Sequence, residues 1–400
     1  MPLRPPLLEI FLVALRLGCT SFGGPVAHLA YFRQEYVEKR GWLDEAHFAD
    51  LVALCQFLPG PASSQAIFGI GYLKRGLCGG FAATLGFTLP SALLMIGFAY
   101  GITSMGNLGT AGWLRGLKVA AVAVVAQALW AMSRSLCPDW SRRGLALVAA
   151  GLVLWQPLAW SQMAIIAVGA GLGRLWLNGD REAGLDRRTL RPPAEPGGPA
   201  LPEIICLVSF FALLLGLPVL AHLTENPWLE IFDRFYRAGA LVFGGGHVIL
   251  PLLEREVVAP GWLTHDQFLA GYGVAQAVPG PLFTLSAYLG AVMRHGPGGW
   301  LGGAWALLAI FLPALLLVAG VLPLWRHLRH QPAAQAALRG ANATVVGVLL
   351  AAFYDPVWIA GITGGRSLGL AVAAFVALLS GKIPVWAVIL ALSALGHSLL

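Results

Sequence analysis

Long apolar segments separated by short polar ones run through almost the whole sequence. They lie at roughly 7–24, 77–101, 113–133, 144–158, 160–177, 203–221, 231–250, 300–322, 338–354, 367–380 and 383–400. A membrane-spanning helix needs about 20 apolar residues, so the paired segments within 144–177 and 367–400 are short for this role. The pattern predicts an all-α, polytopic membrane protein with about 12 or 13 transmembrane helices.

Composition supports a membrane protein and excludes most soluble classes. Only 11% of the 400 residues are charged, whereas soluble domains carry about 25%, and 58% are apolar. A soluble enzyme, a disordered chain and a disulfide scaffold are therefore excluded. The net charge of +7 comes from basic residues scattered among apolar segments, so no nucleic-acid partner is expected. The five cysteines form no CxxC pair, and we expect no metal and no other cofactor.

The longest polar stretch, 178–200, lies near the middle of the chain, and the sequences on its two sides repeat. At offsets of 220 to 224, 8–11 matches 229–232, 22–24 matches 243–245, 59–61 matches 279–281, and 114–116 matches 338–340. This register indicates an internal duplication, which is typical of transporters. We expect a first repeat over 1–177, a cytoplasmic linker over 178–200, a linking transmembrane helix over 201–224 and a second repeat over 225–400.

The linking helix has no partner in the first half, so it can invert the second half. If the segments 46–74 and 266–293 are each one broken membrane crossing, the halves are inverted. If these segments are re-entrant hairpins, the same count makes the halves parallel. Both arrangements place most Lys and Arg residues on the side of the N-terminus and the linker, and the positive-inside rule assigns that side to the cytoplasm.

The sharpest motif is Pro-Gly-Pro, at 59–61 and again at 279–281. Two prolines around a glycine cannot continue a helix, and irregular backbone at membrane depth requires protein or a wet cavity around it. The helix that restarts after each break presents free N–H groups to an anion, although a simple packing kink is the alternative. The candidate substrate ligands are Gln56, Gly60, Ser63, Ser64 and Gln65, with Gln276, Gly280 and Thr284 in the second half.

A second paired motif, Phe-Gly-Gly, supplies Gly23 and Gly24 and their counterparts Gly244 and Gly245. Consecutive glycines allow a close backbone approach, either to a ligand or to another helix. These four glycines are therefore also candidate substrate ligands, with helix packing as the alternative.

Charged residues inside the apolar segments are the remaining candidates. Arg16 and Arg237 match each other and could offset the charge of an oxyanion, with pairing to an acid as the alternative. Candidates for proton handling are His28, Glu35, Asp50 and Glu256. Of these, Glu35 and Glu256 are expected on solvated, charge-rich loops.

These motifs resemble those of the chromate ion transporter family. The resemblance rests on Phe22-Gly23-Gly24-Pro25 with His28, on Glu35 and Arg40-Gly41-Trp42, and on Gln56, Pro59-Gly60-Pro61 and Gln65, and it continues at 243–246, 261–262 and 276–281. It covers nearly the whole chain, in a form with two homologous halves. The resemblance implies export of chromate from the cytoplasm through the inner membrane as a resistance function, driven by the membrane potential or a proton gradient. It also implies halves of opposite orientation. The second half departs from the pattern at Gly246 and Leu285, which indicates an asymmetric site dominated by the first half.

One mechanism agrees with both the residues and the resemblance. A tetrahedral dianion sits near the bilayer midplane, held by the two half-helix N-termini, with Arg16 or Arg237 offsetting its charge. Sulfate or another oxyanion fits equally well, because it shares size, charge and shape with chromate. A lipid-modifying membrane enzyme would need a clustered His/Asp/Glu set that the sequence lacks, so no enzyme activity is expected. A scaffold without transport would not require broken helices in both halves. The expected partners are the oxyanion, a coupling ion and the lipid bilayer, with a homodimer as one possible state.

Overall fold

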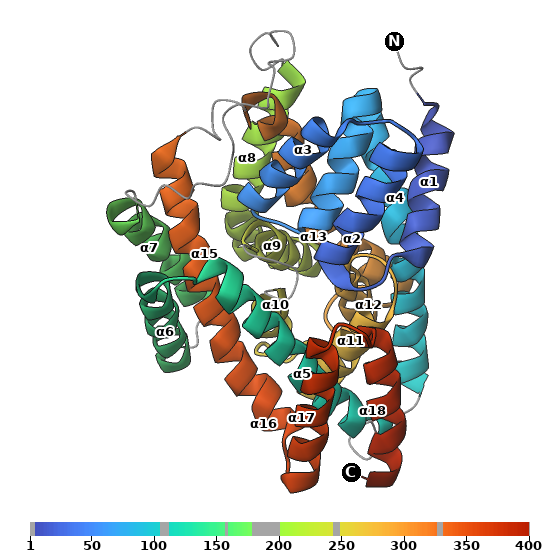
Figure 1. The fold of residues 1–400 in the computed structure, drawn as a ribbon, viewed down its shortest axis with the longest axis vertical. Helices are drawn as coiled ribbons and strands as arrows, with labels where there is room; N and C mark the ends of the chain where they lie inside the picture. Colours follow the sequence, from blue (N-terminus) through green and yellow to red (C-terminus); the bar gives the residue numbers. More distant parts are fainter. Residues whose placement is uncertain are drawn as a thin grey trace.

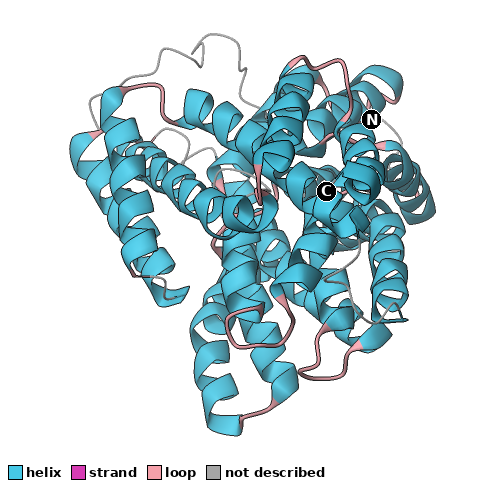
Figure 2. Cartoon of the chain, turned by 90° about the horizontal axis from the view of Figure 1, so that it is seen from below, coloured by secondary structure: helices cyan, strands magenta, loops and turns pink. Residues whose placement is uncertain are grey.

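The chain folds as a bundle of helices that begins at one end of the molecule and finishes at the other (Figure 1). The computed structural model describes residues 5–104, 112–156, 159–177, 201–242, 249–325 and 331–399. Every regular element within these ranges is a helix, which confirms the predicted all-α class (Figure 2). The candidates Gly244 and Gly245 and the 178–200 linker lie outside the described residues.

The first half and the linking helix contain eight described α-helices and one π-helical turn. They are α1 (Leu7–Thr20), α2 (Gly24–Phe32), η1 (Arg33–Lys39), α3 (Glu45–Phe57), α4 (Ala62–Ser104), α5 (Gly112–Leu136), α6 (Trp140–Trp155), α7 (Ala159–Trp176) and the linking helix α8 (Leu201–Thr224). Helix α4 is really two arms, because Arg75 and Gly76 leave the helical conformation and Gly76 has a φ of 61°.

The described second half repeats this order. It contains α9 (Pro227–Ala240), α10 (Ile249–Val257), α11 (His265–Ala277), η4 (Leu282–Thr284), α12 (Leu285–Val292), α13 (Gly299–Val321), η5 (Leu322–Leu324), α15 (Pro332–Ala352), η6 (Phe353–Trp358), α16 (Ile359–Gly361), α17 (Gly365–Leu379) and α18 (Val385–Leu399). The elements η4 and α12 match the first arm of α4, and α13 matches its second arm.

Each half opens with two hairpins. In the first, η1 runs back along α1, because Arg16 pairs with Glu35 and Glu9 pairs with Arg40. In the second, the first arm of α4 runs back along α3, because Gly69 packs directly against the side chain of Leu51. The turns of these hairpins are the Phe-Gly-Gly and Pro-Gly-Pro motifs.

The second half has the same two hairpins. Arg237 of α9 pairs with Glu256 of α10, and Tyr288 of α12 donates a hydrogen bond to the carbonyl oxygen of Gln267 in α11. The arms contain 13 or 14 residues in α1, α3 and α9. At 1.5 Å per residue these helices are about 20 Å long, too short to cross a hydrocarbon core of about 30 Å. The Pro-Gly-Pro segments therefore re-enter instead of crossing, which answers the question that the sequence left open.

The two halves nevertheless run in opposite directions. Trp300 at the start of α13 donates its N–H to the hydroxyl of Tyr100 near the end of α4, and Gly303 packs against Ile96. The helix α13 is thus antiparallel to the α4 arm that it matches. The sequence argument tied re-entrant hairpins to parallel halves because it counted the first apolar segment as a crossing. This segment also folds back and does not cross, so the first half makes one membrane crossing fewer than that count assumed. The linking helix α8 then starts the second half on the opposite side of the membrane, which inverts it.

The halves also interlock. Helix α5 packs against α17 and α18 of the second half, and α15 packs against α6 and α7 of the first. Close glycine contacts mark both crossings: Gly116 with Gly396, and Gly340 with Gly173. Because these pairs are equivalent under the repeat, the interlocking has the same internal symmetry as the hairpins.

The described helices include five that are long and apolar enough to cross a membrane. They cover Ala62–Thr103, Gly112–Leu136, Leu201–Thr224, Gly299–Leu324 and Pro332–Gly361, and shorter apolar helices accompany them. In α8 only 22% of the most apolar window is buried in the protein, so most of this helix faces outward. An outward apolar surface of this size requires lipid around it, and the chain is an integral membrane protein.

Candidate functional site

The Pro-Gly-Pro turns of the two halves make equivalent contacts with the opposite half. The N–H of Gly60 donates to the carbonyl oxygen of Val242 at 2.6 Å, and the N–H of Gly280 donates to that of Ser21 at 2.9 Å. Ser21 directly follows α1, and Val242, at the matching position, is the second residue after α9. Each turn therefore satisfies a carbonyl at the end of the other half's first hairpin arm. We call these the Gly60 contact and the Gly280 contact.

Both contacts require glycine. Gly60 has a φ of +128° and Gly280 a φ of +93°, which side chains rarely adopt. A Cβ on Gly60 would lie 3.0 Å from the Ala314 Cβ, and a Cβ on Gly280 would lie 2.8 Å from the Ser91 Oγ. Each turn is thus wedged against the proline-containing helix of the opposite half, near the middle of that helix. This position places both contacts near mid-depth of the membrane.

The polar side chains after the two turns differ in their bonding. Ser63, Ser64 and Gln65 are buried, and Gln65 donates through Nε2 to the carbonyl oxygen of Pro59 at 2.7 Å. Within the described part of the chain, the Ser64 hydroxyl and the Gln65 Oε1 have no hydrogen-bond partner. The hydroxyl of Thr284, which matches Ser64, instead donates to the Pro281 carbonyl oxygen at 2.8 Å. The first half therefore keeps free polar groups at its turn.

The two candidate glutamines lie less deeply than these residues. Gln56 is exposed near the end of α3, and Gln276 is half-buried near the end of α11. Asp50 is half-buried on α3, where the matching residue of the second half is Ala270. The structure therefore groups Gly60, Ser64 and Gln65 closely, and leaves Gln56 on an open surface.

The first Phe-Gly-Gly turn also has unusual backbone. Gly23 and Gly24 have φ values of 98° and 77°, and Gly23 is exposed. A few residues later, His28 is buried and packs edge-on against Phe87 with ring centroids 5.4 Å apart. Neither nitrogen of its ring has a hydrogen-bond partner among the described residues.

Arg16 does not stand alone in the membrane. Its guanidinium contacts Glu35 at 2.5 Å, and Arg40 bridges Glu35 at 2.8 Å and Glu9 at 2.6 Å. The Arg40 guanidinium also lies over the Trp42 ring, 5.5 Å from its centroid. These contacts tie the two arms of the first hairpin together.

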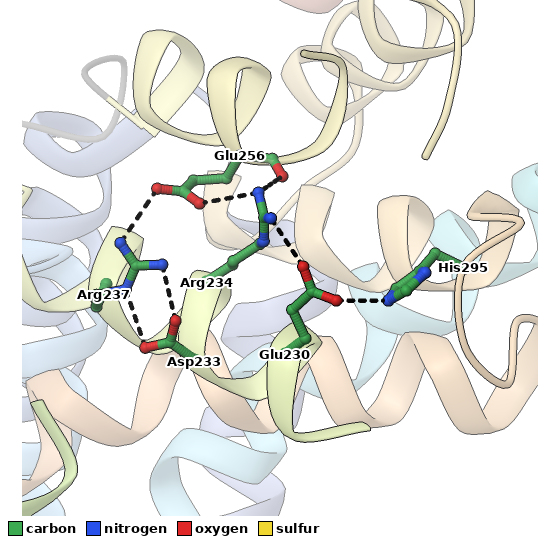
Figure 3. A network of polar contacts seen from close by, with 6 residues as sticks. All are labelled: Glu230, Asp233, Arg234, Arg237, Glu256 and His295. Atoms are coloured by element: carbon green, nitrogen blue, oxygen red, sulfur yellow. Dashed lines mark hydrogen bonds and ion pairs between the residues drawn. The ribbon is translucent and has the colours of Figure 1, made fainter. Parts of the chain in front are cut away.

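Arg237 lies in an equivalent network in the second half (Figure 3). It donates to both carboxylate oxygens of Asp233, at 2.9 and 2.7 Å, and contacts Glu256 at 3.5 Å. Arg234 bridges Glu230 at 2.8 Å and Glu256 at 3.5 Å. His295 contacts the other side of Glu230 at 2.9 Å.

In both networks an arginine bridges two glutamates, although this arginine lies on a different arm of the hairpin in each half. Glu9 and Glu35 match Glu230 and Glu256, yet the bridge between them is Arg40 on the returning arm in the first half and Arg234 on the leading arm in the second. Arg234 also lies over a tryptophan, 4.5 Å from the centroid of the Trp262 ring. The tryptophan of the Gly-Trp motif thus lies against the bridging arginine in both halves.

These networks correct one expectation and favour an alternative for another. Glu35 and Glu256 are not on solvated loops but are buried on η1 and α10, because each pairs with two arginines. Arg16 and Arg237 pair with acids, as the alternative interpretation held. The bridging residues Arg40 and Arg234 were not singled out as site candidates, because they do not match each other in the repeat.

The described residues contain no group of three or more His, Cys, Asp or Glu side chains that could hold a metal ion. The donors at the Gly60 and Gly280 contacts are hydroxyl, amide, imidazole and backbone N–H groups. Such donors suit an anion.

Known proteins share the sequence of both halves. A family model described as "Chromate transporter" matches residues 8–174 and 229–397. A chromate transport protein of Pseudomonas aeruginosa is 28% identical over 390 residues, 96% of this chain and 90% of the relative. A probable chromate transport protein of Synechococcus elongatus is 27% identical over 344 residues, 84% of this chain and 81% of the relative.

A further relative is matched over a shorter stretch. An uncharacterized transporter of Bacillus subtilis is 32% identical over 143 residues, which are 35% of this chain and 76% of the relative. No solved structure matches the chain. Since the family model covers both halves and includes both pairs of hairpins, the chain belongs to the chromate transporter family.

Proposed function

We propose that the protein exports chromate from the cytoplasm across the inner membrane and so confers resistance to it. The observation that carries this proposal is the pair of Pro-Gly-Pro turns, each of which contacts the first hairpin of the opposite half near mid-depth. The substrate binds in the region of these contacts, and the names of the relatives supply chromate as its identity.

Inverted halves provide a simple route to alternating access. The first-half hairpins open toward the end of the molecule that contains the N-terminus, and the second-half hairpins open toward the opposite end. If the hairpin pairs rock against the interlocked helices, the contacts become accessible from each side in turn. The ion-paired arms keep each first hairpin rigid during this movement.

The membrane potential favours export of a dianion. Moving one charge through 100 mV changes the free energy by about 2.3 kcal/mol, so a dianion leaving a negative interior gains about 5 kcal/mol. This gain is sufficient without a nucleotide, although a coupled proton would add to it. We place the N-terminus and the 178–200 linker in the cytoplasm, because most basic residues lie on that side.

The proposal is tested with inside-out membrane vesicles, in which export appears as uptake. Vesicles that contain the full chain should accumulate radiolabelled chromate when their interior is made positive, whereas vesicles from cells without the protein should not. Excess unlabelled sulfate separates the two oxyanions: a transporter that prefers sulfate would lose chromate uptake, whereas a transporter that prefers chromate would keep most of it. No difference in chromate uptake at good expression would refute the proposal.

A further inference from the structure

The two equivalent contacts have the same backbone geometry, but the side chains that the opposite half contributes to them differ in polarity. Around the Gly280 contact lie Ser21, His28 and Ser91, all of them buried. The residues at the matching positions around the Gly60 contact are Val242, Ile249 and Ala314, also buried. Three polar side chains from the first half at one contact are thus replaced by three apolar ones from the second half at the other, where the polar side chains are Ser64 and Gln65 of the turn itself.

The same difference runs along the helices that support the contacts. Thr84, Thr88 and Ser91 follow one another at spacings of four and three residues, so they lie on one face of α4 with Phe87. Phe87 contacts His28 on this face, and its carbonyl oxygen contacts Gly18. In α13 the matching positions are Leu307, Phe311 and Ala314.

Polar groups at the Gly280 contact and along this face of α4 are unsatisfied within the described residues. The hydroxyls of Ser21, Thr84 and Thr88 and both ring nitrogens of His28 are buried without a hydrogen-bond partner. Buried polar groups are normally paired, and each unpaired one destabilises the fold. The backbone arrangement does not require these groups, because the Gly60 contact has it with apolar residues at the three matching positions. At that turn the Ser64 hydroxyl is an unpartnered donor within the described residues, whereas the unpartnered Gln65 Oε1 can only accept.

Several of these groups lie close to one another. The Ser21 carbonyl oxygen accepts the hydrogen bond from Gly280, and the His28 ring lies beside this carbonyl. The Ser91 hydroxyl donates to the Thr88 carbonyl oxygen at 3.1 Å. Its oxygen lies beside Gly280, 2.8 Å from where a Cβ on that glycine would be. The unpartnered groups therefore come from the first hairpin and from α4, next to the opposite Pro-Gly-Pro turn.

We propose that the oxyanion binds at the Gly280 contact and not at the Gly60 contact, so that each chain has a single substrate site. The hydroxyls of Ser21, Thr84 and Thr88 and an N–H of His28 donate to the oxyanion. This inference rests on the proposed function and adds the location and number of sites. Neutral donors bind an anion without a fixed counter-charge, so the anion can also leave.

The chain itself supplies the test substitutions. The triple variant Ser21→Val, His28→Ile, Ser91→Ala gives the Gly280 contact the side chains of the Gly60 contact. In purified full-length protein we expect at least a tenfold rise in the Kd for sulfate, a probe that does not oxidise thiols, and loss of chromate uptake in vesicles. Thermal stability in detergent should be unchanged or higher, because unsatisfied groups have been removed. Ala314→Ser, at the Gly60 contact, is the matched control and should retain wild-type binding.

Each outcome bears on a different statement. Wild-type affinity in the triple variant would overturn the assignment, and equal weakening by Ala314→Ser would overturn its one-sidedness. If the triple variant does not fold, Ser21→Ala and Thr88→Val are measured singly, and wild-type Kd values in both would overturn it too. Transport of neither chromate nor sulfate by the wild-type protein would instead refute the proposed function. Labelled sulfate and labelled chromate, measured separately, identify which oxyanion uses the site.

Discussion

The matching arginines Arg16 and Arg237 should respond very differently to neutralisation. The Arg237 side chain is 8% exposed, and its partners Asp233 and Glu256 are 6% and 10% exposed. Arg16 is 57% exposed, although its partner Glu35 is 5% exposed. The repeat alone predicts equal roles for the two residues, whereas the structure predicts unequal ones.

The magnitudes follow from what each substitution leaves behind. Arg237→Gln removes the bidentate partner of Asp233 and leaves its carboxylate buried, which costs about 3–5 kcal/mol of the free energy of unfolding. Arg16→Gln leaves Glu35 paired with Arg40 at 2.8 Å and with Lys39 at 3.7 Å. Because the lost partner is exposed, the cost should be at most about 1 kcal/mol.

The assay is equilibrium unfolding of the purified full chain in mixed detergent micelles, followed by helical circular dichroism. Asp233→Asn, combined with Arg237→Gln, removes both buried charges and should recover most of the lost free energy. Equal losses for the two single variants, or a double variant less stable than Arg237→Gln, would refute the reasoning. Chromate uptake by vesicles with Arg16→Gln distinguishes two roles for this residue. If Arg16 only ties the hairpin arms together, transport should be retained, whereas the charge-offset hypothesis predicts its loss.

Two further predictions concern the turns and the inverted arrangement. Gly60→Ala and Gly280→Ala should each abolish transport, because at these positive φ values an added Cβ would lie 3.0 Å or less from neighbouring atoms. Gly97→Ala is the control and should keep transport, because a Cβ at this position in α4 meets open space. Uptake assays in vesicles compare the three variants. In a variant without the native cysteines, single cysteines at Asp44 and at His295 should react with a membrane-impermeant maleimide from opposite sides of the membrane, and labelling of both from one side would contradict the inverted halves.

The hydrophobic pattern predicted the long helices and the repeat, but not the path of the chain. The apolar run at 7–24 is long enough to cross a membrane, yet α1 ends at Thr20 and the chain turns back at Gly23 and Gly24. A hydropathy pattern records how much apolar sequence is present and not its direction. The pairing of Glu9 with Arg40 and of Arg16 with Glu35 fixes the direction, and it involves residues far apart in sequence.

The candidate site was predictable in part for the same reason. Pro-Gly-Pro motifs locate backbone breaks, and the structure places both breaks against the opposite half. The partners of each break could not be inferred, because Ser21, Ser91, Val242 and Ala314 lie in apolar segments with no motif of their own. Sequence comparison between the halves could have found them, since a serine matches an apolar residue at each of these positions.

The duplication separates scaffold from chemistry. Both halves retain the Glu–Arg–Glu bridge of the first hairpin, even though the bridging arginine comes from the returning arm in one half and the leading arm in the other. A feature that survives with its residues exchanged is required for its geometry, which here is a rigid hairpin. The donors that bind the substrate need not occur in both halves, because one dianion near the membrane centre needs only one set of them. On our proposal the substrate-binding donors therefore remain where the two halves differ, at the Gly280 contact, and the matching charges of Arg16 and Arg237 hold the hairpins in place around it.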